Sequence, residues 1–477
     1  MAALTFSSCN DFLDVKPTES ADASESIRTV ADAQIMMRGI MSKLSSSSYY
    51  GRNFPLYADT KGGDFTVVSQ GRGFDYLYAF NHSASSNNYS GIWVQGYHAL
   101  AQINNLLTQI KNIQSTGSSE NFDSHVGQAL TLRALIHFDL VRLYGEPFNE
   151  NKTALGVPVV TELLDADAQL GRNTVEEVYN QIIADLTEAE PLLSKSKANG
   201  FVNFYANKAL QAKVYLYQED FTKSLAAAES IITSNVYSLY SNANWVGSWT
   251  SQYGSESIFE IAMLPSEGDL GTGSLGMYFR NKNHGTTSAL GYFTASTGFI
   301  NLMNEDPTDV RLGIMANDEL NRKGAIYKYS GSTTLAGDGK GNSTAVNIKV
   351  IRLSEVYLIA AEAALRASAP NREKAAEYLN QIRKRAAGLA PATAATVNLD
   401  MISNERAKEL AGEGHRFFDM MRLNKTITFD DDLGGIITTH RDGTIDRSHF
   451  KTILPIPLDE INANPVIKQQ QNPGYNQ

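Results

Sequence analysis

ANKALQAKVYLYQEDFTKSLAAAESIIT, residues 206–233, and SEVYLIAAEAALRASAPNREKAAEYLNQIRKRA, residues 354–386, share one pattern. Each predicts a helix rich in small residues, a short polar connection and a second alanine-rich helix. Alanines at helical spacing let helices approach closely, and helix pairs of this length are typical of tetratricopeptide-type repeats. Two unrelated helical hairpins are the alternative. We predict a mainly α fold built as a degenerate, tetratricopeptide-like helical repeat scaffold.

Three earlier segments also show the period of amphipathic helices. Apolar residues recur every three or four positions in residues 90–113, 124–148 and 173–193, which places them on one helix face. Thr174 and Glu177 stand at the spacing of a capping box, so the third helix is expected to begin there.

The segments between these helical blocks differ from them in composition. Residues 237–347 are rich in Gly, Ser, Thr, Asn and aromatic residues, and residues 61–90 resemble them. The segments 257–263 and 325–331 predict short strands. We expect long, irregular, aromatic excursions from the helical scaffold, and such segments often carry function.

The only cysteine, Cys9, follows the stretch LTFSS near the start of the chain. A single cysteine forms no intramolecular disulfide, and no companion zinc ligands lie nearby. Small residues before a cysteine are typical of the end of an export signal. We therefore predict a lipoprotein cleaved before Cys9 and acylated on its sulfur, with more than one acyl chain for a stable anchor. The alternative is an incidental cysteine in a tail.

Composition argues against several functional classes. The net charge is −10 and no basic cluster stands out, whereas nucleic-acid partners favour positive charge. No run of eighteen apolar residues is present to span a bilayer. HExxH, Walker lysine and GxSxG motifs are absent. The 22 tyrosines and 20 phenylalanines suit either a core or the apolar face of a sugar.

Three further features are expected to have no chemical role. The GxGxxG match at 271–276 is not followed by an amphipathic helix, so we predict a plain loop. The acidic run 430–432 could attract calcium, but it lacks the spaced oxygen ligands of a defined loop. We expect a solvated charge run there and predict no cofactor. His137, on a helix face, is expected to be a packing residue with satisfied hydrogen bonds.

The strongest polar cluster lies in NERAKELAGEGHRFFDMMRLNK, residues 404–425. Three glutamates recur four residues apart, with arginines and an aspartate interleaved. They are Glu405, Glu409, Glu413, Arg406, Arg416, Asp419 and Arg422. Paired carboxylates could serve a glycosidase, but there they flank the bond from opposite sides. Stacked along one helix and matched with arginines, they predict a partly buried ion-pair network instead.

These motifs lead to a family resemblance. SCNDFLDVKP (8–17), WVQGYHALAQINNLL (93–107), RLSEVYLIAAEAAL (352–365), ERAKELAGEGHRFFDMMR (405–422) and ILPIPLDEINANPVIKQQQNPGY (453–475) resemble, in order, segments of the SusD/RagB family of surface glycan-binding lipoproteins. The resemblance implies a SusD-like α-α superhelix and a non-catalytic protein. It also implies an outer-membrane lipid anchor as the only membrane attachment, at the cell surface, and a SusC-like TonB-dependent barrel partner that imports captured oligosaccharide.

The chain is therefore divided into six parts. They are the remnant of a lipoprotein signal ending at Cys9 (1–9), an N-terminal segment with an aromatic loop (10–88), a helical repeat region (89–236), an irregular ligand-binding excursion (237–347), a C-terminal helical repeat region (348–425) and a C-terminal loop segment (426–477).

The composition of the two irregular segments suggests the candidate ligand-binding residues. They are Arg72, Asp75, Tyr76, Tyr78, Asn81, Tyr89, Tyr278, Arg280, Tyr292 and Phe293. Packing inside an irregular domain is the alternative for each aromatic residue, and Trp93 and Trp245 are expected to be structural. Two other functions stay open at this point: a surface glycosidase, or a tetratricopeptide-type adaptor that binds protein and caps a transporter for non-glycan cargo.

Overall fold

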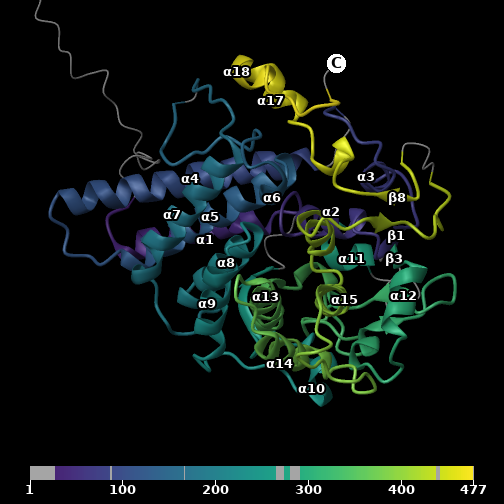
Figure 1. The fold of residues 1–477 in the computed structure, drawn as a ribbon. Helices are drawn as coiled ribbons and strands as arrows, with labels where there is room; N and C mark the ends of the chain where they lie inside the picture. Colours follow the sequence, from purple (N-terminus) through teal and green to yellow (C-terminus); the bar gives the residue numbers. More distant parts are fainter. Residues whose placement is uncertain are drawn as a thin grey trace, which may run out of the picture.

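The computed structural model describes residues 27–85, 89–165, 167–264, 273–279, 290–436 and 441–475. Helices dominate the regular structure, as predicted (Figure 1). The long helices are α1 (Val30–Ser45), α4 (Ser90–Ser115), α5 (Asp123–Tyr144), α7 (Val175–Ala189), α8 (Phe204–Tyr217), α9 (Phe221–Ile232), α13 (Leu353–Arg366), α14 (Arg372–Arg383) and α15 (Leu399–Leu410).

The shorter helices connect and flank the long ones. They are α2 (Asn53–Lys61), α3 (Phe74–Tyr78), α6 (Phe148–Asn151), α10 (Asn242–Ser248), α11 (Leu275–Phe279), α12 (Thr297–Met303), α16 (Arg416–Arg422), α17 (Leu458–Ala463) and α18 (Pro465–Lys468). Short 3₁₀ helices are η3 (Glu190–Leu192), η6 (Val310–Ile314), η7 (Ser343–Ala345) and η8 (Phe450–Thr452).

The two segments that set the fold form helix pairs that pack on each other. The pair α8–α9 meets the pair α13–α14 through contacts between α9 and α13, and all four helices lie together in Figure 1. Ala228, Ala360 and Ala363 are fully buried. Small side chains let the helix axes approach closely, which is why alanine-rich stretches became the inner helices of the scaffold.

The capping box also forms as predicted. The Thr174 hydroxyl accepts a hydrogen bond from the Glu177 amide, and the Glu177 carboxylate accepts one from the Thr174 amide at 2.8 Å. The two bonds satisfy amide groups that a helix start otherwise leaves unpaired, so α7 begins directly after Thr174.

Strands among the described residues are short and antiparallel. They pair as β1 (Phe65–Val67) with β3 (Phe293–Ala295), β2 (Ser257–Ile261) with β6 (Ile348–Arg352), β4 (Met315–Ala316) with β5 (Ala325–Ile326) and β7 (Ile427–Thr428) with β8 (Thr444–Ile445). The strand predicted at 257–263 is confirmed over 257–261, whereas only the first two residues of 325–331 are strand. The pairs β1–β3 and β2–β6 join segments that lie far apart in the chain.

Within the described residues, every helix is too short or too polar to cross a bilayer.

The glutamates of the predicted ion network are held together, but not on one helix. Glu405 and Glu409 lie on α15, which ends at Leu410, and Glu413 follows in the turn beyond it. Gly412 and Gly414 adopt positive φ angles there, a conformation that glycine takes without the steric cost of a Cβ atom. The expectation of three glutamates on one helix was therefore wrong.

Arg352, at the end of β6, is the centre of this network. Its guanidinium lies 3.1 Å from Glu256, 3.0 Å from Glu409 and 2.7 Å from Glu413. Arg385 also bridges Glu256 at 2.6 Å and Glu409 at 3.0 Å. The side chains are almost completely buried rather than partly buried as expected. The network ties β6 and α15 to the residue directly before β2 and to the turn that follows α14.

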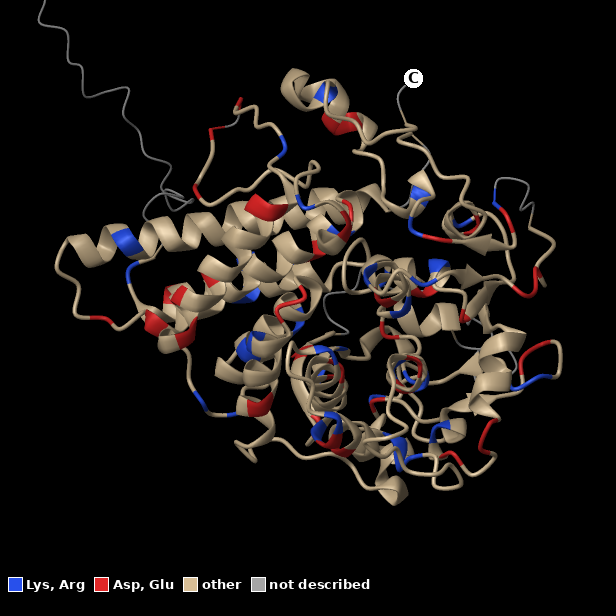
Figure 2. Cartoon of the chain, viewed as in Figure 1, with Lys and Arg blue, Asp and Glu red and all other residues tan. Residues whose placement is uncertain are grey.

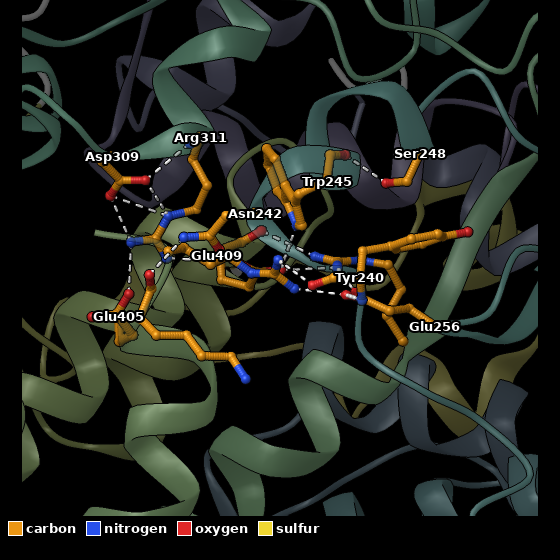
Figure 3. Close-up of polar contacts among 12 residues, drawn as sticks. Tyr240, Asn242, Trp245, Ser248, Glu256, Asp309, Arg311, Glu405 and Glu409 are labelled. Carbon is orange, nitrogen blue, oxygen red and sulfur yellow. Dashed lines mark hydrogen bonds and ion pairs between the residues drawn. The ribbon is translucent and has the colours of Figure 1, made fainter. Parts of the chain in front are cut away.

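The same network reaches η6 and α10. Arg311 lies 2.7 Å from Asp309 and 2.6 Å from Glu405, and the indole N–H of Trp245 donates to Glu409 at 3.3 Å. Figure 3 shows these side chains converging from separate elements. Buried charges are tolerated only when they are paired and hydrogen-bonded, so the network specifies how these elements meet.

The remaining charges of the predicted cluster form separate contacts. Asp419 on α16 lies 2.8 Å from Arg406 and 2.9 Å from Arg422, and Arg422 continues to Glu362 on α13 at 2.6 Å. Arg416 faces away and contacts Asp64 at 3.2 Å. Residues 404–425 therefore contribute to two buried ion clusters and to one contact with Asp64, directly before β1.

We predict that Glu409→Gln lowers the free energy of unfolding by about 3–5 kcal/mol at pH 7, because it leaves buried arginines uncompensated. Burial alone would raise the pKa of Glu409, but Arg385, Arg352 and Arg311 outweigh burial and lower it to about 2. A lowered pKa means that the ionised carboxylate stabilises the fold above its unfolded pKa, and that this contribution is lost as pH falls towards about 2.

Urea unfolding at several pH values tests this prediction. The stability gap between the natural chain and Glu409→Gln is expected to narrow on acidification below the unfolded pKa of a glutamate. Glu188→Gln, at an exposed position of α7, is the matched control, with a change within about 0.5 kcal/mol. Equal stability of the two variants would contradict the assignment.

Candidate functional site

The aromatic candidates fall into an exposed and a buried class. Tyr76 on α3 is 43% exposed, and Arg72 just before this helix is also exposed. The buried members are Tyr78, Tyr89, Tyr278, Tyr292 and Phe293. Arg280 and Cys9 lie outside the described residues. As the structure stands, only the first class presents its side chains to solvent.

Strand pairing explains why the second class is buried. Val67 pairs with Phe293 across β1 and β3, which brings the first loop against the middle excursion. The Phe293 ring centroid lies 5.7 Å from that of Phe74 and 5.3 Å from that of Tyr292. Tyr278 joins them, 5.5 Å from Phe74. The sequence thus located two segments that do meet, and their rings form a small aromatic core.

Asp75 fixes the turn before α3. Its carboxylate accepts backbone N–H bonds from Gly71 at 3.2 Å and Gly73 at 3.0 Å, and a hydroxyl bond from Tyr292 at 3.3 Å. Burial, with the negative charge of Asp75 adding to it, raises the pKa of Tyr292. Asn81 is half-buried and donates its backbone N–H to the Tyr76 carbonyl at 2.8 Å. Both polar candidates therefore shape the loop around Tyr76.

A cavity of about 140 Å³ opens beside this aromatic core. Its wall joins residues from the three segments 10–88, 237–347 and 426–477: Val68, Phe279, Gly291, Phe293, Thr294, Asp318, Glu319, Leu320, Ala325 and Leu433. Phe279 and Phe293 are buried in its wall, whereas Leu320 is 52% exposed at its rim. Apolar walls with a few convergent polar groups are typical of ligand sites.

The rim of this cavity is the connection 317–324 between β4 and β5, which we call the hairpin loop. Asp318 organises it by accepting backbone N–H bonds from Leu320 and Arg322, both at 2.9 Å, and a hydroxyl bond from Thr294 at 2.6 Å. Burial would raise the pKa of Asp318, but these hydrogen bonds and the charge of Arg322 outweigh it and lower the pKa. Asp318 is therefore ionised and already bonded, and the exposed Glu319 carboxylate is the freer acceptor.

The acidic run 430–432 directly precedes Leu433 of the cavity wall. Asp431 accepts hydroxyl bonds from Thr66 and Thr297, both at 2.8 Å, and pairs with Arg322 at 3.2 Å. Asp432 lies 2.6 Å from Arg441. The expectation of a solvated charge run was wrong for Asp431, which is half-buried and attaches the C-terminal segment to β1, α12 and the hairpin loop. Asp432 is exposed, as expected.

Tyr78 reinforces the same attachment. Its hydroxyl donates to the Asp431 carbonyl at 2.8 Å or to the Asp432 carboxylate at 2.9 Å. Within the described residues, no group of three or more His, Cys, Asp or Glu side chains is arranged to hold a metal ion.

Other sequence expectations are resolved at this level. His137 is buried, with Nδ1 3.0 Å from the Arg133 carbonyl and Nε2 accepting from the Val160 amide at 3.2 Å, so it is a satisfied packing residue. Burial lowers its pKa to about 4. Trp93 and Trp245 are buried, as expected. The plain loop predicted for 271–276 is wrong at its last two residues, because α11 begins at Leu275. Residues 271–272 lie outside the described residues.

Sequence reasoning missed the hairpin loop and Leu433. The stretch 317–324 is polar and short, and such composition signals a turn without saying what the turn faces. Leu433 stands alone in an acidic, glycine-containing stretch, so no periodicity marked it. The pairing of β4 with β5 forms the hairpin loop, and Asp431 attaches the stretch before Leu433 to β1. These tertiary contacts bring both beside Phe293.

Comparison with known proteins gives the fold a family. The model of the SusD family matches residues 277–475, and a second model, described as starch-binding and associating with the outer membrane, matches residues 11–216. A SusD superfamily protein of Bacteroides thetaiotaomicron is 33% identical, covers 94% of this chain and 100% of its own, and superposes with a TM-score of 0.86. The chain belongs to the SusD family.

Two further relatives support this assignment. A Bacteroides vulgatus structure named for sugar binding is 33% identical, with 94% of this chain and 100% of that chain covered and a TM-score of 0.83. A SusD-like protein of Formosa agariphila is 24% identical over 98% of this chain and 97% of its own length. SusD-like proteins bind carbohydrate and are not catalysts, so the chain is not an enzyme. The glycosidase alternative is thereby withdrawn.

We predict that Tyr278→Ala and Tyr76→Ala differ sharply in their effect on folding. Tyr278 is buried among Phe74, Tyr292 and Phe293, and loss of such a ring costs about 3–5 kcal/mol. Tyr76→Ala is expected to change stability by no more than about 0.5 kcal/mol, because the side chain is largely in solvent. Urea unfolding measures both, and similar midpoints for the two variants would show that Tyr278 is not part of the core.

Proposed function

We propose that this protein captures glycan chains at the cell surface and passes them to a SusC-like TonB-dependent outer-membrane barrel. Membership of a carbohydrate-binding family supports the proposal, and the cavity beside β3 carries it at the level of residues. A pocket of about 140 Å³ is small beside typical drug-sized sites. It would therefore hold one part of an oligosaccharide whose remaining units extend over the rim.

The chemistry of the cavity wall suits a sugar. The apolar side, with Phe279, Phe293 and Leu320, matches the C–H face of a sugar ring, and aromatic edges and faces give large, rigid contact surfaces. Glu319 can accept hydrogen bonds from sugar hydroxyls, and these are strengthened because the acceptor is charged. Asp318 holds the hairpin loop that presents Glu319 and Leu320.

The position of the cavity also agrees with the proposed ligand-binding excursion. Most of its wall belongs to 237–347, while Val68 comes from 10–88 and Leu433 from 426–477. We propose Tyr76 and Arg72 as outer contacts for a longer chain, since both are exposed on the loop that packs against β3. The buried candidates act here by supporting the wall.

We further propose attachment to the outer membrane through lipid on Cys9. The description of the family model that matches residues 11–216 supports this location, and a lone cysteine after a small-residue stretch supports the chemistry. A lipid anchor would leave the folded part free to sit against a barrel transporter while it holds its cargo.

We predict that Glu319→Ala combined with Leu320→Ala weakens glycan binding about tenfold or more, because a charged hydrogen bond and an apolar contact are lost together. Affinity electrophoresis on plant, host and microbial polysaccharides would first identify the glycan that retards the natural chain without being degraded. The double variant is then measured on that glycan.

The chain offers a matched control in Glu162→Ala with Leu163→Ala. This pair has the same residue types in the same order, and Leu163 is 53% exposed against 52% for Leu320. Its binding should equal that of the natural chain. Equal retardation of both double variants would move the site elsewhere. Absence of any retarding glycan would favour an adaptor that caps a transporter for other cargo.

We predict that Cys9→Ser releases the protein from membranes when it is expressed with its export signal. Serine cannot be acylated through sulfur, so the anchor is lost while the fold is unchanged. Fractionation of membrane and soluble material, with metabolic labelling by a fatty acid, measures both effects. Retention of the variant in the membrane fraction would contradict a lipid anchor at this position.

A further inference from the structure

A second and larger cavity, of about 520 Å³, lies away from the hairpin loop. Residues 82–85 form one wall, Phe450 and Lys451 of η8 another, and α17, α18 and the tail 469–475 complete it. In Figure 1 these C-terminal elements stand together at the top of the molecule, beside the C-terminus. The proposed glycan site shares none of these residues.

The charges of this cavity are all of one sign. Lys451 and Lys468 line it, and its described lining contains no carboxylate. No ion pair with either ammonium group is found among the described residues, although the chain as a whole carries a net charge of −10. Figure 2 shows the basic position on α18 next to acidic positions on α17. Glu460 of α17 contacts Trp93 and Asn464 instead.

Lys451 is well placed to gain from an anion. Partial burial lowers its pKa, because the ammonium has lost part of its hydration. A negative group in the cavity would offset that loss through a charge-assisted hydrogen bond. His82, in the same wall, does not share this role, because burial and then the charges of Lys61 and Lys451 hold its pKa well below the usual range. The lysines are thus the positive charges of the site.

An aromatic ring stands beside these lysines. Phe450 is 42% exposed, although His449 stacks on it with a centroid separation of 5.4 Å. Tyr475 meets its edge at 5.4 Å, and the Lys451 ammonium lies 5.6 Å from the ring centre. An exposed ring next to a cation matches a ligand that has an apolar face and a negative group on the same unit.

Two other polar side chains of this cavity, those of Gln471 and Tyr475, already form hydrogen bonds within the protein. Gln471 exchanges hydrogen bonds with the backbone of Ile456, at 2.8 Å and 3.0 Å, so its amide serves the fold. The Tyr475 hydroxyl donates to the Ile453 carbonyl at 3.0 Å. Gln469 is exposed on the cavity wall and is the side-chain amide that could reach a ligand hydroxyl.

We propose that this cavity is a second saccharide site, selective for sugars that carry an anionic group such as a uronate carboxylate or a sulfate ester. Lys451 and Lys468 bind the anion, the exposed part of Phe450 contacts the ring, and Gln469 meets a hydroxyl. The inference rests on the proposed function only in taking a saccharide as its ligand. A protein of net negative charge would otherwise repel such chains.

Calorimetric titration of the full, unacylated chain tests this assignment. The probes are a trimer of galacturonic acid, the methyl ester of the same trimer and a sulfated trisaccharide. The acidic trimer should bind and its uncharged ester should bind about tenfold more weakly or not at all, since hydrogen bonds to charged groups contribute most. Added salt should weaken acidic-trimer binding, because the lysines are only partly buried.

The variant Lys451→Ala with Lys468→Ala should lose acidic-trimer binding about tenfold or more. Lys43→Ala with Lys111→Ala makes the same change in net charge, at one half-buried and one exposed position, and should bind as the natural chain does. Binding of the sulfated probe alone would assign the site to sulfate esters. No binding of either anionic probe, equal binding of the methyl ester, or equal loss in both lysine pairs would overturn the proposal.

The two sites can fail independently. Polysaccharide retardation that disappears in the Glu319/Leu320 variant but persists in the Lys451/Lys468 variant supports the hairpin-loop site alone. Loss of acidic-trimer binding in the lysine variant, with no effect of the Glu319/Leu320 changes, supports the C-terminal cavity alone.

Discussion

The buried guanidinium of Arg352 is the constraint on which the rest of the molecule depends. It meets Glu256 directly before β2, Glu409 near the end of α15 and Glu413 in the turn beyond. A charge removed from water is stable only when its partners are correctly placed. These ion pairs therefore allow few other arrangements of the strand pair β2–β6, the helix pair α13–α14 and helix α15. The irregular segment between β2 and β6 begins and ends at this fixed arrangement.

A smaller group of ion pairs holds the proposed glycan site in place. Arg322 lies 3.1 Å from Asp318 and 3.2 Å from Asp431, which joins the hairpin loop to the C-terminal segment beside β1 and β3. At this cavity Arg322 balances Asp318 and leaves Glu319 as a negative group, whereas the described lining of the C-terminal cavity contains lysines and no carboxylate. Two pockets on one chain thus differ in charge, and this difference would let them receive different parts of a mixed saccharide.

Much of the helical scaffold was predictable because its signals are local. Apolar periodicity located α4, α5 and α7, and the Thr174–Glu177 capping box set the start of α7. Alanine spacing identified the pairs that became α8–α9 and α13–α14. The interleaved charges of 404–425 predicted an ion network, but they did not predict that it is almost completely buried. Arg352, Arg385 and Arg311 come from other segments, and no spacing within 404–425 reveals them.

By itself, the sequence determined the helix-pair scaffold, the absence of catalytic motifs and the two irregular segments that meet at β1 and β3. Only the tertiary structure decided that Tyr278, Tyr292 and Phe293 pack into a core while Tyr76 stays in solvent. It alone brought Leu320 and Leu433 to one cavity, and Lys451 and Lys468 to another. The reason is physical: helix formation depends on neighbours three or four residues away, whereas burial and pocket shape depend on contacts between residues far apart in the chain.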